Sequence, residues 1–561
     1  MNSKKEMLKS STAICLAMSY MCCFFEPLQL YFTNIEEYWY DIYNLLPVCL
    51  LLFFIAFFLM ESVLLVLNIV NDKLWTFSYV ALGIIFLCFY IQGNYLAGNL
   101  PILDGNAVDW HKYDEQRIYS LVLWGVVLLA TVILCRIKKM DFAVKAYKWL
   151  SLFILAILIF TNITTCFMKK GMVDKGKFSV TYKDFMSMSG EGKNFVILLL
   201  DSVNGEEMEQ WLSEDPQIRE TLKDFTYYDN LMAGYPSTIH SIYQILGGDW
   251  YECTESINDY RTRVLLTSPL FDTLEEQDYA EGLYTDEAPF LENEGLYRFD
   301  NYEKLQPSFS SVWKFVKVEM RMVGLKYMPY DLKRRCLVLP NEISDLKTLE
   351  NGKDAPYEED NDIFLDYMRE PFDLSDRNAF RFIHLWGAHA PYVYDRHLNR
   401  LTEETDYYET VRATIGMAMC YVTKLKEQGI YDNTAILILS DHGFNSEPCE
   451  EYHYNPYDRQ HAILFAKGFG EQRESMKVSN APIAMEDLPS AYLKLLEGNS
   501  GDNIFPYKEG ETRERRYLLY ILPDTLKFKE YIQYGQAGDE DTMIPTGKYY
   551  KWPDGLVNDL E

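Results

Sequence analysis

The stretches NFVILLLD at residues 194–201 and NTAILILSDHG at residues 433–443 decide the fold of this chain. Each contains a continuous apolar run that leads into an acidic residue, Asp201 in the first and Asp441 in the second. Strands that are buried on both faces of a parallel sheet have this continuous pattern, whereas half-exposed strands alternate apolar and polar residues. The two stretches therefore predict buried parallel strands with polar residues at their carboxyl ends.

Strand-like and helix-like patterns alternate through the rest of this region. Further strands are predicted at 279–286, 380–389 and 461–468. Helical patterns occur in GEEMEQWL (205–212), in SPLFDTLEEQ (268–277), over 408–428 and over 485–499. This alternation predicts an α/β domain with a mostly parallel central sheet and helices on both of its faces. Ligands of such sheets bind beyond the carboxyl ends of the strands.

The first 170 residues contain five apolar segments of the length that crosses a bilayer. They lie at about 11–32, 45–69, 75–95, 118–135 and 147–167. Lys and Arg precede the first segment and follow the second and fourth, which places these parts in the cytoplasm. Because the number of spans is odd, we expect everything after about residue 168 to be extracytoplasmic. The predicted organisation is a five-helix transmembrane domain at 1–170, a linker at 171–190 and an extracytoplasmic α/β domain at 191–561.

Charge is divided unevenly along the chain. Residues 1–175 carry 14 Lys and Arg against 13 Asp and Glu, whereas the remainder carries 39 against 69. Proteins that bind nucleic acid need a basic surface to contact the phosphate backbone. The acidic remainder therefore argues against a nucleic-acid partner and suits a metal-dependent domain.

Polar residues gather where the predicted strands end. Asp201, Asp441 and His442 offer two carboxylates and an imidazole, a set that suits Zn²⁺, or Mn²⁺ in an oxygen-rich site. His389 could hold a phosphate oxygen, give a proton to a leaving alcohol or join a second metal site. His384, on or near a strand, suits a structural role and is also a candidate for binding substrate. Either His461 or His453 could reach the same pocket, and the residues alone do not separate them.

The stretch GYPSTIHS (234–241) has a turn signal before an apolar run, so it predicts a helix N-terminus. Taken alone, its hydroxyls favour helix capping. Beside two acids and a histidine, the Thr238 hydroxyl could also be the fourth metal ligand, which would lower its pKa and make it a nucleophile. Ser237 and Ser241 are expected to support this turn. His240 is expected to lie outside the metal ligands, because two helical positions turn the chain by about 200°.

Four stretches together resemble the alkaline phosphatase/sulfatase superfamily: STIHS (237–241), HLWGAHAPY (384–392), LSDHG (439–443) and MEDLPSAYLKLLEG (485–498). Five spans followed by such a domain resemble the membrane phosphoethanolamine transferases and the lipoteichoic acid synthases. The resemblance implies that Asp201, Thr238, Asp441 and His442 bind the catalytic metal, and that His389 and a later histidine lie beside the phosphoryl group. Some features differ: the transferases usually have Glu where this chain has Asp201, and the lipoteichoic acid synthases have a basic residue where this chain has Ser237. The C/S-x-P-x-R motif of formylglycine sulfatases is absent.

The resemblance implies a membrane phosphotransferase that uses one divalent metal, Zn²⁺ or Mn²⁺, with room for a second. Its donor would be a membrane phospholipid that carries phosphoethanolamine or phosphoglycerol, and its acceptor a cell-envelope glycan or lipid. Thr238 would carry the phospho-alcohol between the two. One alternative is a hydrolase of phosphate or sulfate esters on the same scaffold, and another is a non-catalytic membrane sensor or scaffold.

Overall fold

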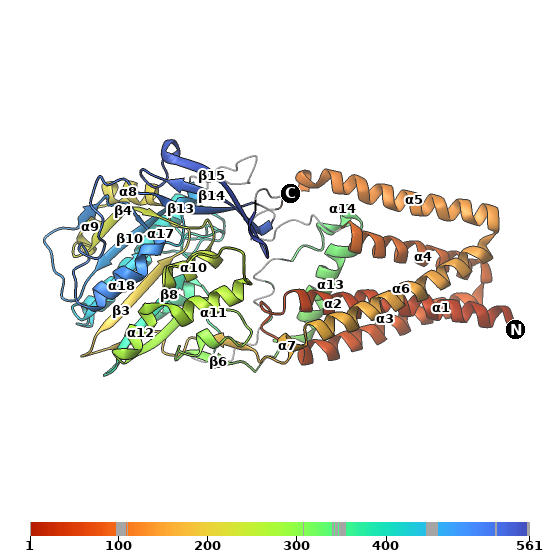
Figure 1. Cartoon of the computed structure of the whole chain (residues 1–561). Coiled ribbons are helices and arrows are strands. Elements are labelled where there is room, and N and C mark those ends of the chain that lie inside the picture. The colour runs from red at the N-terminus through yellow and green to blue at the C-terminus, as the bar shows by residue number, and fades with distance from the viewer. Residues whose placement is uncertain are drawn as a thin grey trace. The chain divides into compact units, whose positions relative to one another are not determined.

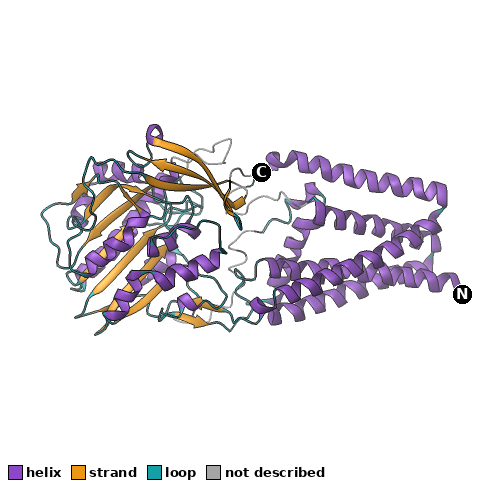
Figure 2. Cartoon of the chain, viewed as in Figure 1, coloured by secondary structure: helices purple, strands orange, loops and turns teal. Residues whose placement is uncertain are grey.

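The computed structural model describes residues 2–96, 108, 110–306, 308–338, 342, 346, 355–444, 458–521 and 524–557. The contacts divide the chain into two compact units. Unit 1 comprises Met1–Phe178, Phe290–Glu292 and Lys304–Leu349, and unit 2 comprises Ser179–Pro289, Asn293–Glu303 and Glu350–Glu561. The first is built almost entirely of helices, and the second contains most of the strands (Figure 2).

Among its described residues, unit 1 contains five helices that are long and apolar enough to cross a membrane. The first, Lys4–Thr33, runs through α1 (Asn2–Tyr20), the π-helical turn η1 (Met21–Phe25) and α2 (Glu26–Thr33). The others are α3 (Ile42–Val70), α4 (Asp72–Tyr95), α5 (Asp114–Lys138) and α6 (Met140–Met168), with the short α7 (Lys170–Val173) after them. Each contains one of the predicted spans, so the predicted helical membrane domain is confirmed.

Unit 1 also holds a segment from much later in the chain. Lys304–Leu349 belongs to it and includes α13 (Val312–Tyr327) and α14 (Tyr330–Lys333). These residues lie within 191–561, the stretch predicted to be extracytoplasmic. The reason for their position is packing: Val323 and Tyr327 of α13 join an apolar cluster with side chains of α1, α4 and α6.

Unit 2 is built around one large sheet with strand order β11-β4-β10-β9-β3-β8-β5, and β12 also pairs with β4. The strands are β3 (Asn194–Leu200), β4 (Thr226–Met232), β5 (Tyr279–Tyr284), β8 (Asn378–Leu385), β9 (Thr434–Leu439), β10 (His461–Lys467), β11 (Lys477–Ser479) and β12 (Ile483–Ala484). Among the described strands of this sheet, only β10 runs antiparallel to its neighbours. The predicted mostly parallel α/β fold is therefore confirmed, although β4, β11 and β12 were not foreseen.

Helices of unit 2 form two groups that pack with the sheet (Figure 1). One group contains α10 (Thr238–Gly247), α11 (Ile257–Thr267), α12 (Pro269–Glu276) and α18 (Leu488–Leu496), and the other contains α8 (Gly205–Glu214), α9 (Pro216–Thr221) and α17 (Tyr407–Glu427). The short α16 (Asn361–Tyr367) precedes β7.

Smaller sheets complete the strands. A four-stranded antiparallel sheet, β13 (Arg515–Ile521), β14 (Asp524–Gln533), β15 (Met543–Lys551) and β16 (Gly555–Val557), lies near the end of the chain. Two-stranded sheets pair β1 (Phe178–Val180) with β6 (Tyr302–Lys304), and β2 (Ser187–Ser189) with β7 (Asp373–Ser375).

The carboxyl ends of β3, β8 and β9 meet at one edge of the large sheet. β3 lies between the other two and is parallel to both, with Leu200 opposite Leu385 and Leu199 opposite Leu439. Gly387, just after β8, has φ +58, and its nitrogen and oxygen bond the side chain of Asn361. A Cβ atom at this glycine would lie only 2.6 Å from the backbone nitrogen of Asp201. The glycine is therefore needed for the close approach of the two strand ends.

We predict that Gly387→Ala destabilises unit 2, because the added methyl group meets rigid backbone in addition to requiring a left-handed conformation. Gly429→Ala is the matched control, since Gly429 has φ +72 but no neighbouring atom within 4 Å of the added Cβ. Thermal unfolding of the full chain in detergent should show a fall in Tm of about 5 °C or more beyond that of the control. Equal Tm values for the two variants would contradict the close-packing account.

Candidate active site

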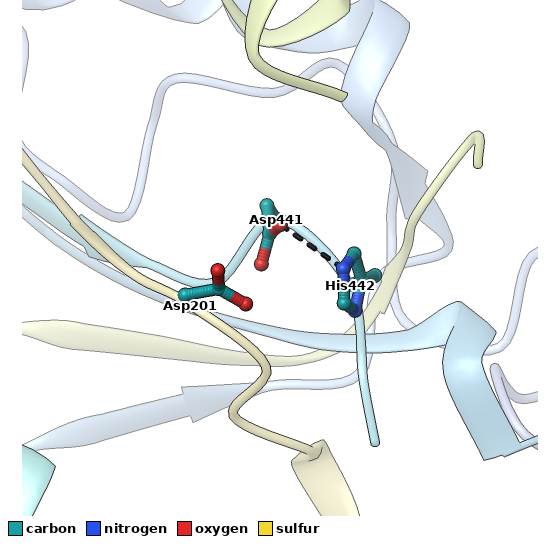
Figure 3. Close-up of side chains that lie close together, drawn as sticks. All are labelled: Asp201, Asp441 and His442. Atoms are coloured by element: carbon teal, nitrogen blue, oxygen red, sulfur yellow. Dashed lines mark ion pairs between the residues drawn. The ribbon is translucent and has the colours of Figure 1, made fainter. Parts of the chain in front are cut away.

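Asp201, Asp441 and His442 converge at the edge where β3 and β9 end (Figure 3). Each offers one ligand atom, and the three atoms lie within 4.8 Å of one another. His442 Nε2 is 3.2 Å from Asp441 Oδ2. All three residues are at most 3 % exposed. The structure thus brings together the three residues that were predicted from the sequence at the ends of the two buried strands.

The chemistry of this cluster fits a divalent metal ion. Asp441 Oδ2 is buried and has no hydrogen-bond partner, an arrangement that costs free energy unless a cation is bound. The Nδ1 atom of His442 lies 2.7 Å from the carbonyl oxygen of Gly443. Donation of the Nδ1 proton to that oxygen leaves the lone pair on Nε2, toward the carboxylates, as a metal-ligating histidine requires.

Ser202 holds the two carboxylates in place. Its backbone nitrogen donates to Asp441 Oδ1 at 3.1 Å, and its hydroxyl donates to Asp201 Oδ1 at 2.5 Å. It has φ +60, which is costly for a residue with a Cβ atom. Tyr407 supports this conformation, because its hydroxyl donates to the Ser202 carbonyl at 2.7 Å.

Thr238 is the first residue of α10 and lies beside the cluster. Its Oγ1 atom is 3.4 Å from Asp201 Oδ2 and 3.5 Å from His442 Nε2. The side chain is half-buried, so the hydroxyl is not sealed within the protein. The first backbone N–H groups of α10 have no partners within the helix and favour a negatively charged group at this position.

The residues around Thr238 differ from the expected capping arrangement. Ser237 has the backbone geometry of a helix N-cap, but its side chain makes no capping bond. Its hydroxyl instead lies 2.8 Å from His240 Nδ1, and the Ser241 hydroxyl donates to Tyr235 at 3.4 Å. The His240 ring stacks on Tyr235, and burial lowers the pKa of His240 to about 3. These side chains therefore support the turn without joining the metal cluster.

A second group lies on the other side of Asp201. Asp201, Glu359 and His384 also bring three ligand atoms within 4.8 Å of one another. His384 Nε2 is 3.7 Å from Asp201 Oδ2, and Nδ1 makes an ion pair with Glu359. Glu359 was missed at the sequence level, because PYEEDND (356–362) has the composition of a solvated acidic loop.

Neighbouring groups of opposite charge shift the pKa values of Asp201 and His384. Burial alone would raise the pKa of Asp201, but the charged imidazole of His384, 3.7 Å away, and the nearby His389 hold it well below its usual range. Burial alone would lower the pKa of His384, but Glu359 and Asp201 raise it well above its usual value. Asp201 is therefore ionised and available to a cation at neutral pH.

The remaining predicted residues have different surroundings. His389 is half-buried, with Nδ1 2.8 Å from the carbonyl of Ala390 and its ring 4.6 Å from that of Trp386. His461 begins β10, where Nε2 lies 2.9 Å from the carbonyl oxygen of Asp229, and burial lowers its pKa to about 4. It belongs to neither group of ligand atoms among the described residues. His453 lies outside the described residues.

Comparison with known proteins gives family and fold information. A comparison with curated sequences finds no match. Structural likeness extends to the lipoteichoic acid synthase LtaP from Listeria monocytogenes, with TM-score 0.35 and 12% identity over 68% of this chain and 88% of that one. It extends also to a phosphonate monoester hydrolase from Silicibacter pomeroyi, with TM-score 0.35 and 14% identity over 64% and 89%. A protein solved with its substrate D-glucosamine-2-N,6-O-disulfate has TM-score 0.40 and 12% identity over 64% and 91%.

The family assignment rests on a sequence model. The sulfatase model matches residues 193–498, which is more than half of the chain and includes every residue of both ligand groups. The chain therefore belongs to the sulfatase family, in agreement with the sulfatase resemblance of its motifs.

Proposed function

We propose that this protein is a metal-dependent membrane phosphotransferase with Thr238 as its nucleophile. The observation that carries the proposal is the position of the Thr238 hydroxyl, within 3.5 Å of both Asp201 and His442 at the N-terminus of α10. The absence of a C/S-x-P-x-R motif favours this threonine over a formylglycine nucleophile. The five apolar helices of unit 1 support a substrate that resides in the membrane.

The proposed reaction has two balanced steps. Thr238 Oγ1 attacks the phosphorus of a phospholipid headgroup, the bond from phosphorus to the diacylglycerol oxygen breaks, and that oxygen takes up a proton as Thr238 gives one up. A hydroxyl of a cell-envelope glycan or lipid then attacks the same phosphorus, the bond from phosphorus to Thr238 Oγ1 breaks, and Oγ1 takes up a proton as the attacking hydroxyl gives one up. The donor headgroup is phosphoethanolamine or phosphoglycerol.

The protein's own side chains have separate roles in this proposal. Asp201, Asp441 and His442 hold one divalent metal, Zn²⁺ or Mn²⁺, which when bound lowers the pKa of the neighbouring hydroxyl and attracts phosphoryl oxygens. The first N–H groups of α10 face the same phosphate. His389, whose Nδ1 lies 2.8 Å from the Ala390 carbonyl oxygen, would in its protonated form give the proton on Nε2 to the leaving diacylglycerol oxygen.

We further propose that unit 2 acts on the extracytoplasmic side, as the distribution of Lys and Arg around the spans indicates. The boundaries 1–170, 171–190 and 191–561 remain a prediction for the order of membrane, linker and catalytic segments, with Lys304–Leu349 as an insertion that joins the membrane unit.

We predict that Asp441→Asn weakens metal binding by more than about 100-fold, because it replaces a buried ligand with a neutral amide. Asp432→Asn, which alters an exposed aspartate at the other end of β9, is the control and should bind metal normally. Calorimetric titration of the chelated full chain with Zn²⁺ and Mn²⁺ measures both affinity and stoichiometry. Unchanged affinity in Asp441→Asn would contradict the metal assignment, and a second equivalent lost in Glu359→Gln would assign the second group to a second metal.

We predict that Thr238→Ala lowers the release of diacylglycerol from phospholipid by at least about 10³-fold, since it removes the attacking oxygen. Thr238→Ser should keep part of the activity, and Ser241→Ala, one helical turn further along α10, should keep most of it. Intact-mass spectrometry after exposure to lipid should show an adduct with the mass of the headgroup in the wild type and none in Thr238→Ala. An adduct of the same mass in Thr238→Ala would exclude this nucleophile.

Transfer and hydrolysis are distinguished by the fate of the headgroup. We predict that headgroup-labelled phosphatidylethanolamine or phosphatidylglycerol yields labelled octyl glucoside when this sugar is supplied as an acceptor, because its hydroxyls compete with water for the phospho-threonine. Thin-layer chromatography of the labelled products measures the partition. Release of the headgroup to water alone, at every acceptor concentration, would support the hydrolase alternative instead.

A further inference from the structure

The inserted helices α13 and α14 of unit 1 have no role in the proposed reaction, yet they pack among the membrane-spanning helices. Of their apolar residues, Val323 and Tyr327 lie in one cluster with Phe86, Phe89, Ile154 and Leu155. Contact with α4 is close, because a Cβ atom at Gly93 would lie 2.2 Å from the Tyr327 ring. The segment is therefore part of the bundle and not a loop beside it (Figure 1).

Polar contacts fix the segment at this position. The Tyr327 hydroxyl donates to Glu26 Oε2 at 2.7 Å, and Lys326 Nζ lies 2.7 Å from Glu26 Oε1. Gln92 donates to the Tyr327 carbonyl at 3.2 Å, and the backbone nitrogen of Tyr330 donates to Ser120 Oγ at 3.2 Å. Glu26 is only 4 % exposed, so its carboxylate needs these partners.

All of these partners lie near one end of the bundle. Glu26 is seven residues before the end of its span at Thr33, Gln92 is three before Tyr95, and Ser120 is six after Asp114. Successive spans alternate in direction, so these three ends share one side, the side on which α6 also ends. At 1.5 Å per residue, the partners lie about 5–10 Å inside the span ends. That is the depth at which amphipathic helices lie in the headgroup region of a bilayer.

The outer face of the segment combines exposed apolar and basic side chains. Trp313 is 76 % exposed, and Val312 and Leu332 are 49 % and 41 % exposed. Exposed basic residues flank them at both ends: Lys314, Lys317, Arg334 and Arg335. Residues 312–335 carry seven Lys and Arg against two acidic residues, in a chain of formal net charge −29. A tryptophan among basic residues is typical of segments that bind the surface of an anionic membrane.

We propose that α13 and α14 form an interfacial membrane anchor whose outer face binds anionic phospholipid, with Trp313 inserted among the lipids and Lys314, Lys317, Arg334 and Arg335 at their phosphates. Charge complementarity selects this occupant, because the outer face exposes Lys314, Lys317, Arg334 and Arg335. The depth set by Glu26, Gln92 and Ser120 places the segment where lipid headgroups are. The proposal does not depend on the phosphotransferase activity.

The test uses the full chain in proteoliposomes whose lipids carry bromine on their acyl chains, since bromine quenches the fluorescence of tryptophan in contact with it. The Trp313 signal is the difference between the wild type and Trp313→Phe. We expect brominated phosphatidylglycerol to lower this signal about twofold or more. Trp149→Phe gives the positive control, because Trp149 is 67 % exposed on the spanning helix α6, and Trp211→Phe gives the negative control, because Trp211 is buried in unit 2.

A second arm tests the choice of lipid. Quenching should be stronger when bromine is on phosphatidylglycerol than when it is on phosphatidylcholine in the same mixture. The double variant Lys314→Glu and Lys317→Glu should remove this preference, whereas Lys508→Glu, at an exposed lysine of unit 2, should not. An unquenched Trp313 beside a quenched Trp149 would overturn the anchor. Equal quenching by the two lipids in the wild type would overturn the preference for anionic lipid.

Discussion

The candidate site depends on one constraint, the parallel pairing of β3 with both β8 and β9. Parallel neighbours in register end at the same edge, so three strands that are far apart in sequence deliver their next residues to one place. Asp201 follows β3, Asp441 and His442 follow β9 after one further residue, and Gly387 follows β8. The missing side chain at Gly387 then allows the loops to approach. Every other feature of the site, including the position of Thr238, is arranged around this edge.

Two buried carboxylates at this edge repel each other, and the protein offsets only part of the cost. Asp201 has the imidazole of His384 and the Ser202 hydroxyl, whereas Asp441 has one backbone N–H, and its Oδ2 atom has no hydrogen-bond partner. A structural ion pair would leave neither oxygen unsatisfied. A bound cation would supply the partner that the second oxygen of Asp441 lacks. The strained backbone of Ser202 is consistent with a site that is held in shape before the cation binds.

Sequence patterns predicted the helices and strands whose residues have the same kind of surroundings from end to end. The five spans and the buried strands are mostly apolar along their length, so period and length were enough. β4 was not foreseen, because TYYDNLM places Asp229 and Asn230 inside a central strand. Glu359 was missed for the opposite reason: its neighbours in an acidic run gave no sign that its side chain is buried against His384. The hydrogen bond between Ser237 and His240 was not predicted either. The His240 ring is held by stacking on Tyr235, a contact that the rules for helix capping do not consider.

The position of α13 shows a different limit of local patterns. Its sequence has the amphipathic character of a helix on a soluble domain, and it lies inside the stretch that matches the sulfatase family. Its partner Glu26 is 300 residues away in the chain, in a span that would otherwise bury an unpaired acid. Contacts of such separation form only after the intervening chain has been made. Unit 1 is therefore completed only when residues beyond 330 are available, and the five spans alone are an incomplete membrane unit.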